Sequence, residues 1–461
     1  MAVQTIKRLF VLMLENRSYD NIFGWSDIRG WTPDGSPTQA EGLLGKPEFV
    51  NRDRRGIPYT VGVGASFQLT FDPGHEFSDV LLQLCGPTSV SAANCLADSA
   101  NLYSDEYPPI RASANDFGFA ACLDDHGYDV AAALRCFTPD QLPVLNFLAH
   151  QFAVCDHWFS SMPGPTWPNR FFSLAGTSWG LDHSPSDLSA LTSNFLNSER
   201  FGNGSDSILT RLAPSEWMVV AGDHAQSWAL AGVEKYPHNF VAYSSFSQLL
   251  NEKSGFLPRY VFVEPAYDAL PMSSFRKGNS MHPLGDVRLG EMLIKEVYET
   301  LKASAYWEES ALLVLFDEHG GFFDHVIPGK CASPMPQGPR DDLTKHNFGF
   351  NQCGFRVPAL VISPYVRQST IDHTVYDHSS ILKTAGALLR PPPAQPLITN
   401  SRISAANSFE KLFSLTVPRH RDDIPPCPPA VPIPNGSLPR TGRTGRSVDA
   451  FQTLPVYRGA A

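Results

Sequence analysis

The chain has 461 residues, of which 43% are hydrophobic and 18% are charged, a composition that is typical of a soluble globular protein and excludes a largely disordered one. Its 36 Lys and Arg residues are outnumbered by 46 Asp and Glu residues, which gives a formal charge of −10. The net negative charge repels polyanions, so it argues against nucleic acid as a partner and against adhesion to anionic membranes. It does not argue against transient contact with zwitterionic lipid.

The first predicted element is a strand over residues 9–14, where an unbroken apolar run follows Lys7 and Arg8. Such a run is typical of a strand that is buried on both faces of a sheet. It is too short for a signal peptide, and no segment of the chain reaches the ~20 apolar residues that a membrane span needs. We therefore expect a secreted or periplasmic location if a leader has been removed, and a cytoplasmic one otherwise.

Helices and strands alternate through the rest of the chain. The spacing of apolar residues predicts helices over residues 141–151 and 285–303, and continuous apolar runs predict strands at 311–316 and 358–363. The longer helix leads directly into the strand at 311–316, a succession that is typical of a doubly wound α/β sheet. Weaker strand candidates lie at residues 218–221 and 260–263.

One long α/β domain is expected over residues 1–418. Within it, residues 26–68 and 85–135 lack clear periodicity and are predicted to be loop-rich insertions, the second of which forms a lid or wall over a site. Residues 419–461 are rich in proline and carry no pattern that could bury a face. We expect this C-terminal tail to be an extended strap or partly disordered.

Eight cysteines are scattered along the chain, and none of them forms a CxxC pair. A structural zinc site of that type is therefore not expected. The spacing of Cys85 with Cys95, and of Cys122 with Cys136, could close two disulfides. Reduced cysteines that fill space in the core are an equally good interpretation of the same residues.

Acidic side chains follow two of the predicted strands. The first strand runs into Glu15 and Asn16, and the strand at 311–316 runs into Asp317 and Glu318. Ligands of open α/β sheets lie beyond the carboxyl ends of strands, and carboxylates that meet there repel one another unless a cation lies between them. Ordinary loop acids are the alternative. A metal site is favoured, with the hard ions Ca²⁺, Mg²⁺ and Mn²⁺ as the first candidates and Zn²⁺ as a further one.

A threonine lies in an unusual loop before an apolar stretch. Thr166 belongs to SSMPGPTWPNR, residues 160–170, where three prolines and a glycine restrict the backbone. Threonine in such a loop is usually only a turn residue. Its hydroxyl would become a nucleophile if a metal lowered its pKa.

Two histidines lie in Gly- or Pro-containing turns. His75 belongs to DPGHE, and His282 belongs to NSMHP just before the long predicted helix. A surface or structural role is the usual one for any single histidine among the 14 in the chain. These two are nevertheless good candidates for binding phosphate and for protonating a leaving group.

Four segments together resemble the phosphoesterase family, which contains bacterial phosphatidylcholine-preferring phospholipases C, plant non-specific phospholipases C and a bacterial acid phosphatase. They are ENRSYD (15–20), TWPNR (166–170), DEHGGFFDHV (317–326) and FRVP followed by SP (355–364), in the order typical of that family. The resemblance implies an alkaline-phosphatase-like α/β fold in which a central sheet is flanked by helices.

The same resemblance implies roles for particular residues. Thr166 would attack phosphorus, and the metal ligands would be Glu15, Asn16, Thr166, Asp317 and Glu318. Contacts to the phosphate, or proton transfer to the leaving group, would come from His75 and His282, with Asn169 and His224 as further phosphate contacts.

The expected function is hydrolysis of phosphate esters through a phosphothreonine, most simply as a phospholipase C that acts on phospholipid head groups. A broad-specificity acid phosphatase is the main alternative, because it would use the same metal and nucleophile. The two would differ in the pocket walls, where aromatic residues of segment 26–140 could form an apolar entry. A catalytically silent binding protein is a third possibility, which the presence of every motif residue disfavours.

Overall fold

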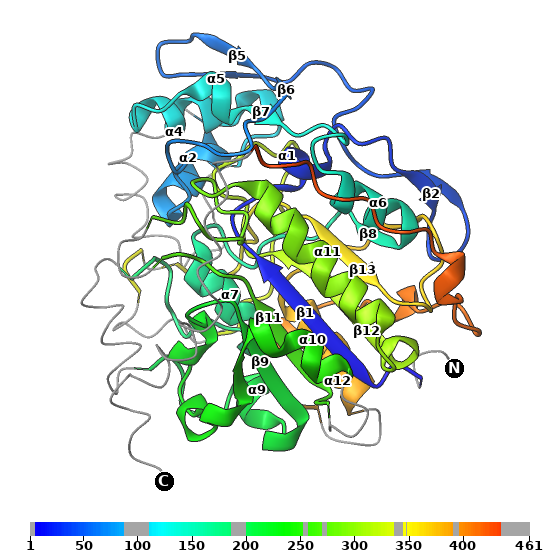
Figure 1. Cartoon of the computed structure of the whole chain (residues 1–461). Coiled ribbons are helices and arrows are strands. Elements are labelled where there is room, and N and C mark those ends of the chain that lie inside the picture. Colours follow the sequence, from blue (N-terminus) through cyan, green and yellow to red (C-terminus); the bar gives the residue numbers. More distant parts are fainter. Residues whose placement is uncertain are drawn as a thin grey trace.

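A ten-stranded mixed sheet forms the centre of the protein in the computed structural model (Figure 1). The structure describes residues 5–86, 110–185, 200–251, 257–269, 274–335, 344–346, 348–390 and 396–434. Helices cover the sheet, so the predicted α/β fold with a central sheet flanked by helices is confirmed. Across the sheet the strands are, in order, β10 (Phe240–Ala242), β9 (Trp217–Ala221), β11 (Tyr260–Glu264), β1 (Arg8–Leu14), β12 (Ser310–Phe316), β13 (Ala359–Ile362), β8 (Ala153–Cys155), β14 (Thr370–Asp372), β2 (Arg29–Trp31) and β3 (Pro37–Gln39).

The strands that were predicted from apolar runs are all present, and they occupy the middle of the sheet. β1 lies parallel between β11 and β12, whereas β13 runs antiparallel to β12. Leu14 pairs with Phe316, so Glu15 and Asp317 are the next residues of both strands at one edge of the sheet. The register of the two central strands thus brings the two polar dipeptides together.

Helices α6 (Pro143–Gln151) and α11 (Val287–Ala303) pack together, as do α7 (Thr166–Ala175) and α12 (Ser379–Leu389). In Figure 1, α11 crosses in front of the sheet and α12 lies behind it. The two predicted helices are confirmed, each beginning two residues later than expected. The start of α11 is set by Asp286, whose side chain accepts a hydrogen bond from the backbone N–H of Arg288.

The segment 26–68 is more regular than predicted. Its first part contributes β2 and β3 to the edge of the main sheet, where β2 pairs with β14. Strands of three residues are too short to show a two-residue hydrophobic period, which explains why the sequence did not reveal them. In the segment 85–135, residues 87–109 lie outside the described part of the chain, and one 3-10 helix and two short α-helices follow them.

The other described elements are small. Two minor sheets pair β4 (Val50–Arg52) with β5 (Pro58–Thr60), and β6 (Gly62–Val63) with β7 (Arg135–Cys136). Of the described helices, none is long and apolar enough to cross a membrane. The remaining α-helices are α1 (Tyr19–Phe23), α2 (Phe77–Cys85), α4 (Phe119–Asp125), α5 (Val130–Ala133), α9 (Ile208–Arg211), α10 (Phe246–Asn251) and α13 (Ser401–Ala405).

The beginning of the Pro-rich tail, residues 419–434, runs along α11. Lys302 of that helix donates to the carbonyl of Ile424 at 3.0 Å, and Arg288 donates to the carbonyl of Pro432 at 3.0 Å. These residues therefore form an extended strap, while residues 435–461 lie outside the described part. The division into a domain at 1–418 and a tail stays a prediction.

Candidate active site

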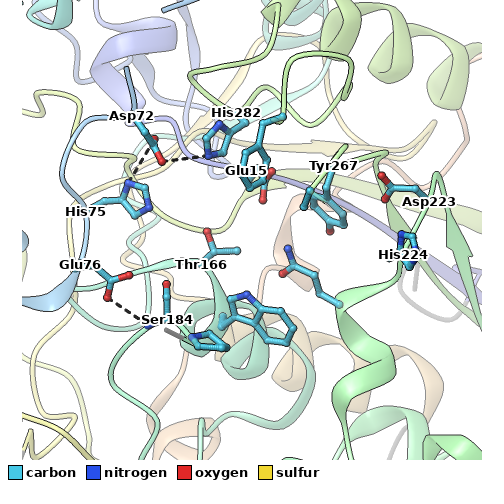
Figure 2. A pocket seen from close by; sticks show the side chains of 15 residues that line it. Glu15, Asp72, His75, Glu76, Thr166, Ser184, Asp223, His224, Tyr267 and His282 are labelled. Atoms are coloured by element: carbon cyan, nitrogen blue, oxygen red, sulfur yellow. Dashed lines mark hydrogen bonds and ion pairs between the residues drawn. The ribbon is translucent and has the colours of Figure 1, made fainter. Parts of the chain in front are cut away.

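A pocket of about 270 Å³ opens at the carboxyl ends of the central strands. Five of the residues singled out in the sequence line it: Glu15, His75, Thr166, His224 and His282. Figure 2 shows Thr166 near the middle, with His75 and His282 on one side and His224 on the other. Segments that are distant in sequence thus meet at the position where open α/β sheets bind ligands.

Thr166 is the first residue of α7, not part of a loop as expected. Its Oγ1 accepts a hydrogen bond from Asn16 Nδ2 at 3.0 Å. The preceding residue, Pro165, offers no side-chain cap, so the first turn of α7 keeps its partial positive charge near the threonine. An anion next to Thr166 is favoured by that charge.

Asn16 connects the predicted ligands to one another. Its backbone has φ of 62°, in the left-handed region that asparagine tolerates better than most residues. In this conformation its N–H donates to Asp317 Oδ1 at 3.2 Å, while its side-chain amide donates to both Thr166 and Glu318. The residue is fully buried, so these hydrogen bonds fix the relative positions of all three partners.

A buried arginine lies between two of the carboxylates. Arg170 of α7 donates from Nε to Asp317 Oδ2 at 3.0 Å, and its Nη2 lies 3.9 Å from Glu15 Oε2. Burial raises the pKa of Asp317 to about 7, against the opposing effect of Arg170. Burial likewise raises the pKa of Glu15 well above its usual range, and Arg170 again opposes the shift. One guanidinium therefore does not fully compensate this concentration of buried negative charge.

The polar atoms at this edge fit a divalent cation. Glu15 Oε1 and Asn16 Oδ1 are buried and have no hydrogen-bond partner among the described residues. Burying such atoms unpaired is costly, and oxygen donors of this kind are ligands for hard cations. Glu15, Asn16, Asp317, Glu318 and Thr166 could hold the ion together, and this ligand set stays a prediction.

Asp72 lies between the two pocket histidines. Its Oδ1 is 3.9 Å from His75 Nδ1, and its Oδ2 is 3.5 Å from His282 Nε2 (Figure 2). Burial alone would lower the pKa of His75, but the charges of Glu318, Asp72 and Glu76 outweigh it and raise that pKa to about 10. His75 is therefore a cation at neutral pH, next to the expected position of a phosphate.

His282 is held in a fixed orientation. Its ring stacks on Phe275 with centroids 4.0 Å apart, and its Nδ1 accepts a hydrogen bond from the N–H of Leu284 at 3.2 Å. Since Nδ1 is an acceptor, the neutral ring carries its proton on Nε2, the atom closer to Asp72. His282 can therefore present a proton from a defined atom.

Asn169 does not line the pocket. Its amide nitrogen donates to the carbonyls of Met162, Gly164 and Pro165, and its oxygen accepts from the N–H of Met162 at 3.1 Å. The side chain is fully buried and holds the turn that precedes Thr166. This geometry gives Asn169 a positioning role, and the predicted contact with phosphate has no support from it.

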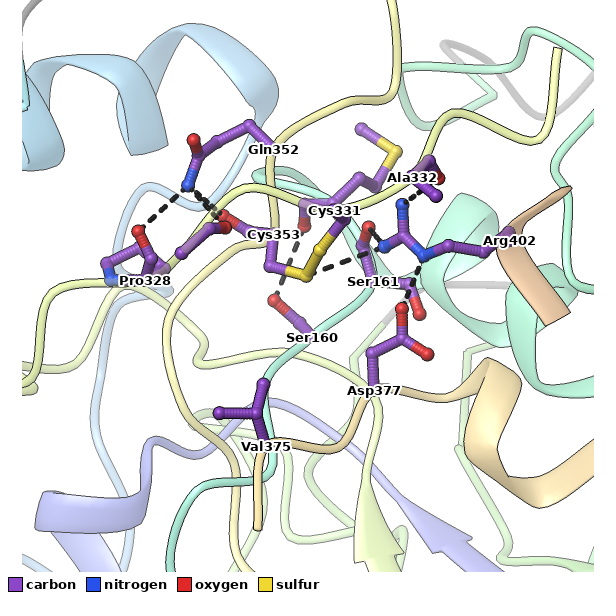
Figure 3. Close-up of a disulfide and its surroundings, with 12 residues drawn as sticks. Ser160, Ser161, Pro328, Cys331, Ala332, Gln352, Cys353, Val375, Asp377 and Arg402 are labelled. Carbon is purple, nitrogen blue, oxygen red and sulfur yellow. Dashed lines mark hydrogen bonds and ion pairs between the residues drawn. A yellow bond between two sulfur atoms is a disulfide. The ribbon is translucent and has the colours of Figure 1, made fainter. Parts of the chain in front are cut away.

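The same turn is also supported by the disulfide Cys331–Cys353, shown in Figure 3. Arg402 lies beside it, 3.5 Å from Cys353 Sγ, and donates to the carbonyl of Ser161. The structure does not join Cys122 to Cys136, one of the two cysteine pairs that were predicted. Cys122 and Cys136 are thiols outside any disulfide, because Cys122 packs against Gln83 of α2 while Cys136 lies in β7. Cys95 lies outside the described residues, so the pairing of Cys85 with Cys95 stays untested.

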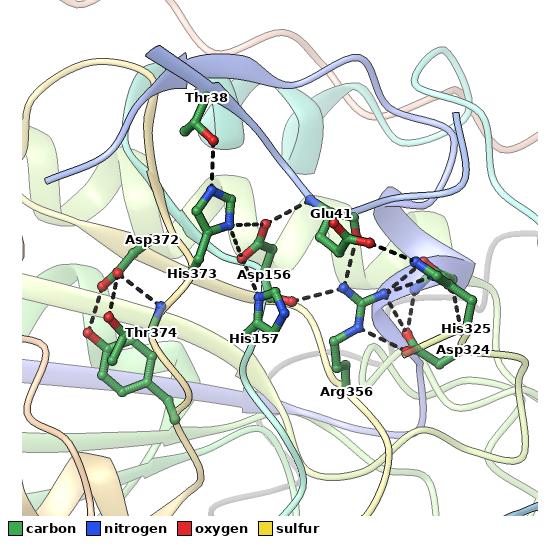
Figure 4. Close-up of polar contacts among 12 residues, drawn as sticks. Thr38, Glu41, Asp156, His157, Asp324, His325, Arg356, Asp372, His373 and Thr374 are labelled. Atoms are coloured by element: carbon green, nitrogen blue, oxygen red, sulfur yellow. Dashed lines mark hydrogen bonds and ion pairs between the residues drawn. The ribbon is translucent and has the colours of Figure 1, made fainter. Parts of the chain in front are cut away.

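Other motif residues form a buried ion cluster, shown in Figure 4. Arg356 donates to Asp324 Oδ1 at 2.9 Å and to Asp20 Oδ1 at 3.0 Å, and His325 Nδ1 lies 2.6 Å from Asp20 Oδ2. These four residues come from three of the sequence motifs. Because such a fully paired network fixes backbone positions, they join the motif segments to one another.

Several residues in or beside the pocket were not singled out from the sequence. Asp72 lies near His75 and Asp223 adjoins His224, and both histidines were predicted site residues. Arg170 lies within TWPNR, so the sequence contained a signal for all three. No sequence signal pointed to Tyr267, because only the fold brings it to the pocket. Its hydroxyl donates to Glu264 at 2.8 Å, and Arg170 stacks on its ring. Among the described residues, no Phe, Tyr or Trp of segment 26–140 lines the pocket, so the expected aromatic wall instead comes from Trp167, Tyr267 and Phe275.

Several known proteins are similar to this chain. The model of the Phosphoesterase family matches residues 6–388. Non-specific phospholipase C3 of Arabidopsis thaliana is 31% identical over 450 residues, which cover 93% of this chain and 76% of that protein. Phospholipase C B of Mycobacterium tuberculosis is 26% identical over 453 residues, covering 90% and 78%. A protein in the alkaline phosphatase superfamily from Vibrio parahaemolyticus, solved by crystallography, aligns with 59% of this chain and 66% of its own at 13% identity, with a TM-score of 0.35.

Proposed function

Since this chain belongs to the Phosphoesterase family and is a phosphoric ester hydrolase, we propose that it acts as a phospholipase C, which releases a phosphorylated head group from a phospholipid. The observation that carries the proposal is the hydroxyl of Thr166, held by Asn16 inside a pocket that is also lined by three histidines. The relatives named phospholipase C align along most of this chain, which favours this substrate class over a phosphomonoester.

Thr166 is the proposed nucleophile. Its Oγ1 would form a bond to phosphorus while the bond from phosphorus to the leaving alcohol oxygen breaks, and the hydroxyl proton would pass to solvent water. The hydrogen bond from Asn16 stabilises negative charge on Oγ1 as it develops. A divalent cation on Glu15, Asn16, Asp317 and Glu318 would lower the pKa of the hydroxyl and compensate the buried carboxylates. Glu318 also contacts Asn16, so the amide of Asn16 is oriented before substrate arrives.

The two histidines are proposed to handle the phosphate oxygens and the leaving group. His75, a cation at neutral pH, would bind equatorial phosphate oxygens. His282 would donate a hydrogen bond from Nε2 to the departing alcohol oxygen and stabilise its developing charge, and that oxygen would take its proton from water. Water would then attack phosphorus from the opposite side, Thr166 would leave as the alkoxide and regain a proton, and the free phosphorylated head group would depart.

An acid phosphatase is the second candidate. The pocket of about 270 Å³ has room for a phosphate and a small substituent, so it does not by itself require a lipid. The same pocket has an aromatic side formed by Trp167, Tyr267 and Phe275, which suits a larger or apolar substituent. We favour the phospholipase for this reason and because of the relatives.

A panel of three substrates tests the choice: p-nitrophenyl phosphate, p-nitrophenylphosphorylcholine and phosphatidylcholine in mixed micelles. We expect kcat/KM to be highest for phosphatidylcholine, with diacylglycerol and phosphocholine as products. A preference for p-nitrophenyl phosphate, with no release of diacylglycerol, would assign the chain to the phosphatases instead.

A further inference from the structure

One aspartate and two histidines form a separate cluster at the edge of the sheet that carries the pocket. Asp156 and His157 follow β8, and His373 follows β14. These strands are parallel neighbours in which Asp372 pairs with Cys155, so the three side chains leave the sheet together. None of them lines the pocket. Figure 4 shows both imidazole rings directed at the carboxylate of Asp156.

The donor atoms of this cluster have the spacing of a metal site. His157 Nδ1 lies 2.9 Å from Asp156 Oδ1, and His373 Nδ1 lies 2.9 Å from Asp156 Oδ2. One donor atom of each residue lies within 4.8 Å of the other two. Ligands on a tetrahedral Zn²⁺ ion with bonds of ~2.0–2.1 Å lie about 3.3 Å apart, so small rotations of the rings would accommodate the ion.

Outer hydrogen bonds support two of the three side chains. Thr38 Oγ1 of β3 lies 2.7 Å from His373 Nε2, the ring nitrogen that does not face Asp156. The backbone N–H of Glu41 donates to Asp156 Oδ2 at 2.7 Å. Metal-binding histidines usually have such a partner on their second ring nitrogen, because it fixes the tautomer and the orientation of the ring.

A cation would also compensate the buried carboxylate of this cluster. The carboxylate of Asp156 is fully buried, whereas the two imidazoles are partly exposed, at 25% for His157 and 36% for His373. The neighbouring Arg356 donates to the backbone carbonyl of Asp156, and no Lys or Arg of the described residues pairs with its carboxylate. The exposed side of the two rings leaves a route for an ion and a position for water.

We propose that Asp156, His157 and His373 form a second metal site, which binds a transition-metal ion of the Zn²⁺ class. Two imidazole nitrogens and one carboxylate oxygen favour Zn²⁺, Co²⁺ or Ni²⁺ over Mg²⁺ and Ca²⁺, in contrast to the oxygen-rich edge at Glu15 and Asp317. Water completes the coordination on the solvent side. The ion connects the ends of β8 and β14 and, through Thr38, the hairpin of β2 and β3. This inference does not rest on the proposed phospholipase activity.

Calorimetric titration of the metal-free protein with ZnCl₂ tests the site, with bound zinc counted by elemental analysis. The double variant His157→Ala/His373→Ala should bind one Zn²⁺ fewer than the wild type. Thr38→Val, which removes only the outer hydrogen bond, should weaken this binding step about 10–100-fold. His238→Ala removes an exposed histidine elsewhere and should bind as the wild type does. Asp317→Asn should retain the histidine-dependent ion.

Diffraction from wild-type crystals soaked in ZnCl₂, measured at the zinc absorption edge, locates the ion without any variant. We expect an anomalous peak between Asp156, His157 and His373. If the peak is missing there, or if the double variant binds as many Zn²⁺ ions as the wild type with equal affinity, the proposal is overturned. The three side chains would then form only a hydrogen-bonded cluster, whose role is to stabilise the fold.

Discussion

Asn16 and Thr166 are joined by a hydrogen bond of 3.0 Å although 150 residues separate them in the sequence. This bond connects the end of the central strand β1 to the first residue of α7. It depends on the left-handed backbone of Asn16, whose φ of 62° turns the amide away from the strand direction and toward the threonine. The conformation of Asn16 thus helps to position the proposed nucleophile, together with the turn that Asn169 holds.

Substitutions of Asn16 should separate its backbone role from its side-chain role. Asn16→Gly keeps the left-handed conformation but removes the amide, so kcat should fall about 100-fold with little change in Tm. Asn16→Ala should lose as much activity and also be less stable by about 1 kcal/mol, because alanine is strained at this φ. Steady-state kinetics and thermal melting measure both effects. Full activity of Asn16→Gly would show that the hydrogen bond to Thr166 is not used in catalysis.

Substitutions of Thr166 test the covalent step. Thr166→Ala should keep the fold and lose several orders of magnitude in kcat, since no hydroxyl remains to attack phosphorus. Thr166→Ser retains the hydroxyl and should stay within about tenfold of the wild type. Acid-quenched digests of the wild type should contain a phosphorylated peptide spanning residue 166 that the alanine variant lacks. Residual activity above about a tenth in Thr166→Ala would rule out the nucleophile assignment.

The sequence predicted the parts of the site that follow long apolar strands. β1 and β12 are continuous apolar runs, so their pattern alone was enough to place the acidic residues after them at one edge of the sheet. Arg170 could not be placed beside Asp317, because that contact depends on how α7 packs against the strand ends. Cys331 and Cys353 are 22 residues apart with no local signal, and their pairing depends on how the intervening chain folds back.

Removal of a carboxylate should remove the cation from the proposed active site. Asp317→Asn replaces a charged oxygen ligand and leaves Arg170 without its partner at 3.0 Å. We expect loss of the bound divalent ion by elemental analysis, together with loss of activity that added metal does not restore at ordinary concentrations. Treatment of the wild type with a chelator should abolish activity reversibly. Normal activity of Asp317→Asn with full metal content would disprove this ligand set.

Asp72→Asn should change the pH dependence of the reaction. The charge of Asp72 helps to raise the pKa of His75 to about 10, so its removal lowers that pKa. His75 would then lose its proton at lower pH, and the alkaline limb of kcat/KM would move toward neutrality. Asp72→Glu, which keeps the charge, serves as the matched control. A uniform loss of activity with an unmoved alkaline limb would give Asp72 a purely structural role.

His282 should act on the leaving group, because its Nδ1 is engaged by Leu284 and its Nε2 remains the proton-carrying atom. If its Nε2–H stabilises the leaving oxygen, His282→Ala should slow hydrolysis of esters with poor alcohol leaving groups far more than that of p-nitrophenyl esters, since p-nitrophenolate departs with little need of such help. The slope of log kcat/KM against the pKa of the leaving group measures this directly. An equal loss for all substrates would instead favour phosphate binding by His282. No loss for any substrate would leave only its stacking on Phe275, and the ring would be a structural part of the pocket wall.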